Sequence, residues 1–381
     1  MFELIDKSWV RWLALALGLG LAFPWNVHGL MTHGAMLMSG AALLALGVMP
    51  YVIALAHRVG ALDIPDQQRR MHRQITPRIG GVAVIVAANI TLFLNFNYSL
   101  ELKGVVLSGL LVAALSFWDD VHEISAAVKL LGQGIAALVL MYCGVHVDFA
   151  PDVWWGLGLE YAVTALWVIG ITNAFNFLDG INGLAAGLAT ATCMLMGLLA
   201  WHTDQTYMFY LCFAIAGAAV GFLPDNARYE KPARTFLGDV GSTYLGWVMA
   251  SIAVLGDWSG EGVLKAYAAP LLIFSVMIFD IIHTTVARIA RGDVHNFHEW
   301  IAYVGRDHLH HRLMALGCSQ KQAVGVVVVF SCLMGLSALA LVNAPMISVV
   351  LLLGQAFLFY AMLSFLMGRA QAHYEAYDEH D

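Results

Sequence analysis

Long apolar segments separated by short polar joints follow one another along almost the whole chain. A membrane-spanning helix needs about 20 mostly apolar residues, and the pattern predicts eleven or twelve spans, depending on whether the first one crosses. The segments lie at 9–28, 35–56, 79–98, 104–118, 128–146, 157–175, 183–201, 207–223, 238–256, 266–287, 323–343 and 346–367. We therefore expect an all-α polytopic integral membrane protein, with residues 1–381 forming one domain.

The composition agrees with this class of protein. Of the 381 residues, 60% are hydrophobic and only 12% are charged, whereas soluble proteins average about 25% charged residues. The net charge of -7 comes without a basic run, so we expect no nucleic acid partner. The five cysteines are scattered without a Cys-x-x-Cys pair, which is typical of apolar packing residues.

The basic residues orient the predicted helices. All of the 19 lysines and arginines except Lys103 and Lys265 fall on one side of the predicted membrane. Because cytoplasmic loops carry an excess of Lys and Arg, that side is predicted to be cytoplasmic. Four polar clusters that are far apart in the sequence also fall on this side. Their common location predicts one active site at the cytoplasmic ends of several helices.

The first cluster reads Asn173-x-x-Asn176-x-x-Asp179-Gly180-Ile181-Asn182-Gly183. The three-residue spacing of Asn173, Asn176 and Asp179 would place them on roughly one helix face, and the glycines would then end the helix. Polar side chains at the end of a membrane helix are costly unless they face water, a partner or a ligand. A helix cap would need only one of them, so a site for a cation or polar ligand is favoured.

The second cluster, Asp119 and Asp120, ends the predicted span at 104–118. Two carboxylates at a helix C-terminus oppose the helix dipole. A metal ion, a basic partner or a catalytic proton transfer would compensate for this unfavourable interaction. The alternative is that both carboxylates only cap the helix end and are exposed to solvent. Lys129, at the start of the next span, either returns to the same surface as a phosphate contact or simply extends toward the membrane surface.

The third cluster, Gly238-Asp239-Val-Gly-Ser242, opens another predicted span. A helix N-terminus with glycines and a hydroxyl suits phosphate, and a carboxylate beside phosphate calls for a bridging divalent cation. Asp and Asn oxygens are hard ligands that suit Mg²⁺ or Mn²⁺ held partly by substrate phosphates. The alternative is that Asp239 only caps the helix.

The remaining candidates lie in two basic loops, and the last of these loops contains the fourth cluster, His308 to Arg312. Arginines and histidines beside a membrane attract phosphate. For the first loop the alternative is that its arginines only reflect the general excess of basic residues in cytoplasmic loops. In the last loop a zinc site is disfavoured, because no cysteine is near and arginines repel a cation. A short interfacial helix is predicted around residues 297–304, where it would wall a groove open to lipid. The candidates are Arg70, His72 and Thr76 in the first loop and His308, His310, His311 and Arg312 in the last.

Taken in order, the four clusters resemble the motifs of the polyprenyl-phosphate N-acetylhexosamine-1-phosphate transferases, over residues 57–325. This family includes the phospho-N-acetylmuramoyl-pentapeptide transferase of cell-wall synthesis. The form Asp307-His-Leu-His-His-Arg-Leu313 is more similar to the branch that transfers GlcNAc-1-phosphate from UDP-GlcNAc to undecaprenyl phosphate and starts O-antigen and other surface glycans. The resemblance implies a magnesium-dependent enzyme of the bacterial inner membrane that releases UMP.

The resemblance also implies roles for the candidates. Asp239 and Asn176 would hold the metal, and Asp119, supported by Asp120, would be the base or positioning group for the lipid phosphate. Asp179 and Asn182 would lie beside the nucleotide. We expect the other candidates to bind phosphates, nucleotide or sugar: Asn173, Lys129, His308, His310, His311, Arg312, Arg70, His72, Thr76, Gly238 and Ser242.

Two departures from the family pattern leave alternatives open. Most bacterial relatives have Asp where this chain has Asn182, so a non-catalytic scaffold is one alternative. The extra span before the arginine-rich loop makes residues 1–30 an expected accessory helix. Other UDP-sugars (GalNAc, 6-deoxy sugars or MurNAc-pentapeptide) remain open as donors, and a homodimer is compatible with the sequence. A transporter is disfavoured, since it would carry polar residues near the membrane midplane in paired repeats.

Overall fold

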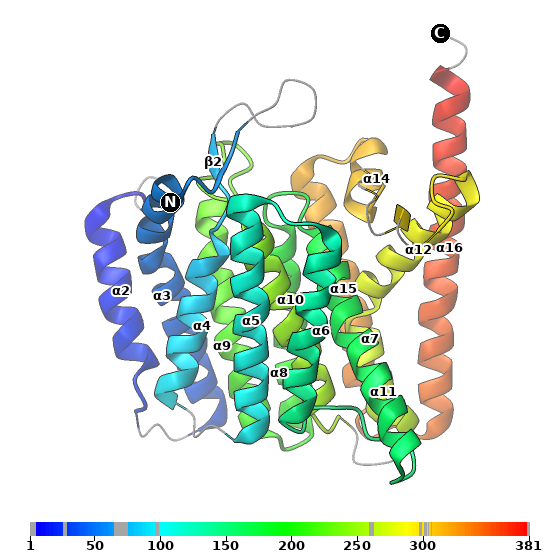
Figure 1. Cartoon of the computed structure of the whole chain (residues 1–381), viewed down its shortest axis with the longest axis horizontal. Helices are drawn as coiled ribbons and strands as arrows, with labels where there is room; N and C mark the ends of the chain where they lie inside the picture. Colours follow the sequence, from blue (N-terminus) through cyan, green and yellow to red (C-terminus); the bar gives the residue numbers. More distant parts are fainter. Residues whose placement is uncertain are drawn as a thin grey trace.

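The structure is a computed structural model that describes residues 5–25, 29–64, 75–95, 99–258, 263–296, 299–300, 303, 305 and 307–378. Arg70 and His72 lie outside these residues, as do most of residues 297–304. The described chain forms a bundle of roughly parallel and antiparallel helices (Figure 1). Its only described strands are β1 (Leu62–Asp63) and β2 (Thr76–Pro77), which pair in antiparallel fashion.

The helices follow the predicted apolar segments closely. In chain order they are α2 (Ser8–Ala22), α3 (Leu30–Val59), α4 (Gly81–Asn95), α5 (Leu100–His122), α6 (Ala126–Tyr142), α7 (Trp154–Leu178), α8 (Leu184–His202), α9 (Thr206–Asn226), α10 (Gly238–Leu255), α11 (Val263–Ile273), α12 (Ser275–Arg291), α14 (Leu309–Ala315), α15 (Gln320–Leu339) and α16 (Met346–Asp378). Among the described residues, seven helices are long and apolar enough to cross a membrane, or eight if the bent pair α11 and α12 counts as one. The protein is therefore an all-α, multi-pass membrane protein.

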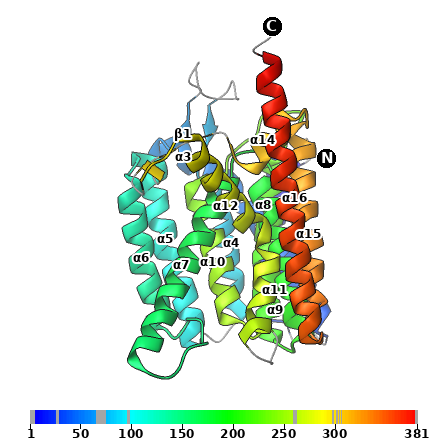
Figure 2. The ribbon, with the colours of Figure 1, turned by 90° about the vertical axis from the view of Figure 1, so that its right-hand side faces the viewer.

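Of the twelve predicted spans, seven coincide with these seven helices, and four coincide with α2, α4, α6 and α10, which are not among the seven. The remaining predicted span differs in shape. Instead of a single straight helix over 266–287, the chain bends by 74° between α11 and α12. The reason lies in the faces of α12: Asp280, Thr284 and Arg288, spaced four residues apart, are buried against the protein, whereas Ile282 and Val286 are exposed. A helix with one polar and one apolar face is suited to an interface, and α12 accordingly leaves the axis of α11 (Figure 2).

The core lies around α8, α9 and α10. In α10 every residue from Val240 to Ala253 is buried, as expected of a helix surrounded by other helices. Close packing comes from small residues: a Cβ added at Gly217 or Gly221 of α9 would lie 2.1 Å from the carbonyl oxygens of Met38 and Ala42 in α3. Close packing around α8, α9 and α10 sets the positions of the surrounding helices and of their ends. The hairpin β1–β2 and α14 mark one end of the bundle, which we call the hairpin end (Figure 1).

Candidate functional site

Eight of the residues predicted from sequence border one cavity of about 1020 Å³ at the hairpin end. Its wall is formed by β1 and β2, the ends of α5, α7 and α9, the loops after α7 and α9, the start of α10, α14 and the start of α15. The predicted residues that line it are Thr76, Asp120, Asn176, Asp179, Asn182, Gly238, Asp239 and His311. The structure therefore brings parts of all four clusters together.

Asp120 joins the end of α5 to the start of α10. Its Oδ2 accepts a hydrogen bond from the amide of Val240 at 2.9 Å, and its Oδ1 lies 3.3 Å from the amide of Asp239 and 3.2 Å from Nε of Arg78. The N-terminus of α10 and the guanidinium thus compensate for a carboxylate at the wrong end of its own helix. In this structure Asp120 caps a distant helix and places Asp239 at the cavity.

Asp119 and Asp239 share the ammonium group of Lys129. The Nζ atom lies 2.8 Å from Oδ2 of Asp239 and also contacts Oδ2 of Asp119. The other oxygen of Asp119 accepts a bond from the amide of Ile124 at 2.8 Å. Lys129 therefore turns back from the first turn of α6 to the end of α5. These contacts make Lys129 a direct neighbour of the lining residue Asp239.

The last turn of α7 supplies amide side chains. The hydroxyl of Ser242 lies 2.6 Å from Oδ1 of Asn176, which connects α7 to α10 one turn after Asp239. Asn173 lies deeper, where its Nδ2 donates to Oε1 of Gln133 at 2.8 Å. Within the described part of the chain Asn173 is not among the lining residues, so its predicted contact with substrate finds no support in this geometry.

The loop after α7 is shaped by its glycines and by His310. A Cβ at Gly180 would lie 2.2 Å from Nε2 of His310, and Gly183 has a φ of +85°. Asp179 lies in this loop, just beyond the span. Its burial, together with the carboxylates of Asp239 and Asp120, raises the pKa of Asp179 to about 8. Asp179 thus shares the cavity with the carboxylates of Asp120 and Asp239, where a cation would be favoured.

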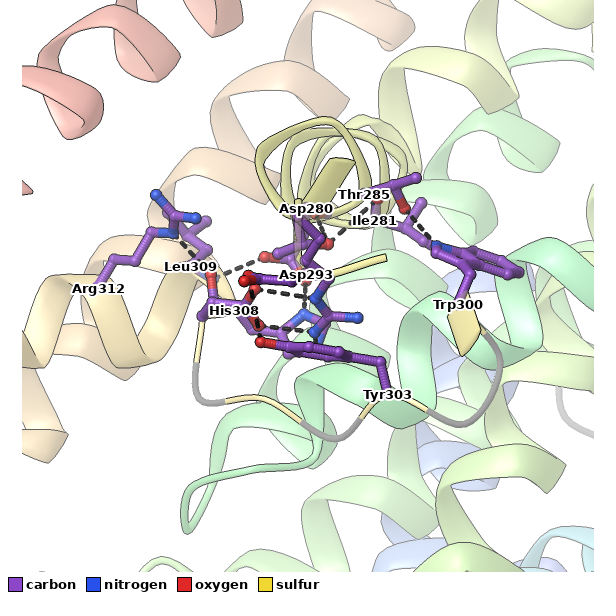
Figure 3. Close-up of polar contacts among 12 residues, drawn as sticks. Asp280, Ile281, Thr285, Asp293, Trp300, Tyr303, His308, Leu309 and Arg312 are labelled. Atoms are coloured by element: carbon purple, nitrogen blue, oxygen red, sulfur yellow. Dashed lines mark hydrogen bonds and ion pairs between the residues drawn. The ribbon is translucent and has the colours of Figure 1, made fainter. Parts of the chain in front are cut away.

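Residues 307–312, which we call the histidine loop and which include the start of α14, are held by α12, as Figure 3 shows. Oδ2 of Asp280 lies 2.7 Å from Nδ1 of His308, and Oδ1 accepts the amide of Leu309 at 2.6 Å. Arg288 forms two bonds to Asp307, at 2.9 and 2.6 Å. Burial alone would raise the pKa of Asp307, but Arg288 and its neighbours lower it to about 2.

Of the three histidines, only His311 lines the cavity within the described residues. His308 is 6% exposed and faces Asp280, and Nε of Arg312 donates to the carbonyl of Asp307 at 2.6 Å. His310 is fully buried, and neither ring nitrogen has a hydrogen-bond partner among the described residues. Burial and the neighbouring histidines lower the pKa of His310 to about 3. His308, His310 and Arg312 therefore lie behind the cavity wall.

Asn226 and Asp280 are among the polar residues of this region that were not predicted from the sequence. Asn226 lines the cavity; its Oδ1 accepts the amide of Gly183 at 2.6 Å and its Nδ2 donates to the carbonyl of Thr235 at 3.0 Å. Asp280 holds the histidine loop. Both stand near or within apolar segments, where a lone Asn or Asp is costly without a partner, and that signal would have found them.

The donor atoms suit a hard divalent cation. Asp239, Asn176 and Asp179 present carboxylate and amide oxygens to one cavity, and Asp119 and Asp239 already share a positive charge from Lys129. Within the described residues, no three His, Cys, Asp or Glu side chains form a metal-binding group by themselves. A cation held here would therefore also need the amide of Asn176 and oxygens of a substrate.

Comparison with known proteins identifies the family. The model of glycosyl transferase family 4 matches residues 102–257. A probable undecaprenyl-phosphate N-acetylglucosaminyl 1-phosphate transferase of Bacillus subtilis is 30% identical over 311 residues, which are 79% of this chain and 83% of that protein. A decaprenyl-phosphate N-acetylglucosaminephosphotransferase of Mycolicibacterium smegmatis is 32% identical over 323 residues, with 74% and 76% of the two chains covered.

A third relative has a different sugar in its name. The phospho-N-acetylmuramoyl-pentapeptide-transferase of Lactiplantibacillus plantarum is 32% identical over 249 residues, which are 59% of this chain and 76% of that protein. The family match also covers the two aspartates of α5, the end of α7 and the start of α10. The chain therefore belongs to glycosyl transferase family 4 and is a membrane-bound glycosyl-phosphate transferase.

Proposed function

We propose that this enzyme transfers GlcNAc-1-phosphate from UDP-GlcNAc to undecaprenyl phosphate. The observation that carries the proposal is the convergence of Asp120, Asn176, Asp179, Asp239 and His311 on one cavity, from four separate parts of the chain. Relatives whose names specify a polyprenyl phosphate and N-acetylglucosamine cover most of the chain. The reaction would be the first membrane step of a cell-surface glycan.

In the proposed reaction a phosphate oxygen of the lipid attacks the sugar-linked phosphorus of the donor. A new P–O bond forms, the P–O bond to UMP breaks, and the product is a lipid diphosphate sugar. The reacting groups are already charged, so catalysis consists mainly of positioning and charge neutralisation. Asp119 would orient or deprotonate the lipid phosphate, and Lys129 would keep the neighbouring carboxylates charged and in place.

The predicted metal fits this proposal. Members of the family depend on a divalent metal, and Asp239 and Asn176, with Asp179 close by, would hold Mg²⁺ together with the diphosphate. The metal would neutralise charge on the donor. Arg228 and Lys231 line the same cavity and would contribute further positive charge near the nucleotide.

The proposed location is the bacterial inner membrane, with the cavity facing the cytoplasm. The distribution of lysine and arginine supports this orientation, and UDP-sugars are made in the cytoplasm. The bent α12 exposes Ile282 and Val286 on the face turned away from Asp280, and this apolar face would lie against the lipid from which the second substrate arrives. A homodimer is a further part of the proposal.

The test is a transfer assay with the purified protein, Mg²⁺, undecaprenyl phosphate and a donor labelled in the sugar. UDP-GlcNAc should give labelled lipid, and EDTA should abolish it. UDP-GalNAc, UDP-6-deoxy sugars and UDP-MurNAc-pentapeptide are assayed in parallel, and a much faster reaction with one of them would reassign the sugar. Labelled lipid from none of these donors would contradict the proposed reaction.

A further inference from the structure

The N-terminal helix α2 is fastened to the rest of the protein by a buried ion pair. The Arg11 side chain is 4% exposed, and its Nη1 and Nη2 donate to Oδ2 and Oδ1 of Asp225 at 2.7 Å each. Asp225 is fully buried in the last turn of α9. Without Arg11, the buried carboxylate of Asp225 would keep only its contact with Arg234 among the described side chains, so the pair holds α2 in one position against α9.

The residue after Asp225 links this ion pair to two walls of the cavity. Asn226 accepts the amide of Gly183 at 2.6 Å and donates to the carbonyl of Thr235 at 3.0 Å. Gly183 closes the loop 179–183, and Thr235 begins the segment that leads into α10. One amide side chain therefore joins both walls, and it follows directly on the residue that Arg11 holds.

A second contact from the same end of α2 reaches the loop after α9. Asp6 lies 2.6 Å from Nη2 of Arg228 and 3.1 Å from Nη1 of Arg234. The same Nη1 of Arg234 lies 3.0 Å from Oδ1 of Asp225. Because Arg228 lines the cavity, the beginning of α2 is connected with the site through two chains of polar contacts.

An accessory anchor would not need these contacts. A helix that only anchors a chain in the membrane needs apolar side chains, whereas a desolvated arginine is costly there without a specific partner. We propose that α2 is a positioning element of the active site. Arg11, acting through Asp225, holds Asn226 where it joins loop 179–183 to the start of α10, and this shapes the nucleotide side of the cavity.

The contacts themselves are tested by hydrogen exchange on the purified, substrate-free protein. Arg11→Met should accelerate exchange about tenfold in peptides covering 179–184 and 226–237. Lys7→Met, which changes an exposed basic residue at the start of the same helix, is the matched control and should leave these peptides unchanged. Unchanged exchange in Arg11→Met, or an equal increase throughout α3 and α9, would overturn the proposal.

Kinetics test the consequence for substrate, which rests on the proposed function. Arg11→Met should raise the KM for the UDP-sugar about tenfold and leave the KM for undecaprenyl phosphate nearly unchanged, and Arg11→Lys should restore part of the loss. Equal changes in both KM values would contradict positioning of the nucleotide side. If no UDP-sugar reacts at all, the proposed function fails, but the exchange experiment still decides whether α2 positions the two loops.

Milder variants cover the case in which Arg11→Met does not fold. Asp225→Asn keeps the size of the side chain but removes its charge, and Arg11→Lys keeps the charge but loses the paired geometry. Each should accelerate exchange in the same two peptides. The double variant Arg11→Lys/Asp225→Asn should be no worse than the more affected single variant, because both changes act on one interaction. Additive effects would show that the two residues act independently and would overturn the proposal.

Discussion

The ammonium group of Lys129 lies 2.8 Å from Oδ2 of Asp239 and contacts Oδ2 of Asp119 as well. A single cation thus bridges the end of α5 and the start of α10, next to the cavity. Two carboxylates this close would repel one another and favour protonation of one of them. The lysine offsets part of this repulsion, because it places one positive charge between the two carboxylates.

Lys129→Met should lower kcat by about 10²- to 10³-fold, the loss that follows removal of one strong electrostatic contact in other active sites. Lys321→Met, an exposed lysine at the start of α15, is the matched control. Initial rates of lipid product formation at saturating donor measure the effect. A Lys129→Met variant with the activity of the Lys321→Met control would show that the bridge has no part in catalysis.

Asp119 and Asp120 should differ in what their substitution changes. Asp120→Ala removes the cap of α10 and the partner of Arg78, so the free energy of unfolding should fall by about 1–3 kcal/mol. Asp119→Asn should keep most of the stability and lose turnover, because its carboxylate is the proposed base or positioning group. Thermal unfolding in detergent and the transfer assay separate the two. Full turnover in Asp119→Asn would rule out the base role.

Asp280 should affect catalytic activity by holding His308 and Leu309 of the histidine loop in place. Asp280→Asn keeps an acceptor for the amide of Leu309 but no longer offers a carboxylate to Nδ1 of His308. We expect kcat/KM to fall about tenfold to a hundredfold, as when a group is displaced slightly in an active site, with a changed pH profile. Asp280→Glu should recover part of the activity. Asp204→Asn, at the exposed turn after α8, is the control; equal effects of the two Asn variants would contradict this role.

His310 should make the protein sensitive to acid. Its pKa is lowered to about 3 in the folded protein, against about 6.5 in the unfolded chain. As pH falls below 6.5 the unfolded chain takes up a proton that the folded protein does not, so stability is lost down to about pH 3, by up to about 1.4 kcal/mol per pH unit.

The check is thermal unfolding of wild type and His310→Phe between pH 7 and 4.5. The variant should lose less stability over this range, since the titrating ring is gone. His295→Phe, at an exposed histidine, should follow the wild type. Parallel curves for wild type and His310→Phe would show that the buried ring does not contribute to the acid sensitivity.

The apolar pattern was enough to predict the helices, because about 20 apolar residues in a row have few other structures open to them. It could not predict the bend before α12, where segment 266–287 is apolar on average and only the contacts of Asp280 and Arg288 show which face is buried. The hydrophobic pattern of one segment does not show which residues of other segments it will contact.

The same limit applies to the site. Asp119, Asn176 and Asp239 could be selected because a carboxylate or amide in an apolar chain needs a reason to be there. That Asp120 caps α10, or that Arg11 reaches Asp225 more than 200 residues away, depends on packing between distant helices. Asn173 and His308 show the converse: they share the pattern of the lining residues but face Gln133 and Asp280.

The central claim is that α7 and α10 contribute oxygens to one metal-nucleotide site, and Mn²⁺ binding tests it most directly. Electron paramagnetic resonance should show about one bound Mn²⁺ per chain in the presence of UDP. Both Asn176→Ala and Asp239→Asn should weaken this binding by about tenfold or more, although the two residues lie on different helices. Unchanged Mn²⁺ affinity in either variant would contradict a shared site.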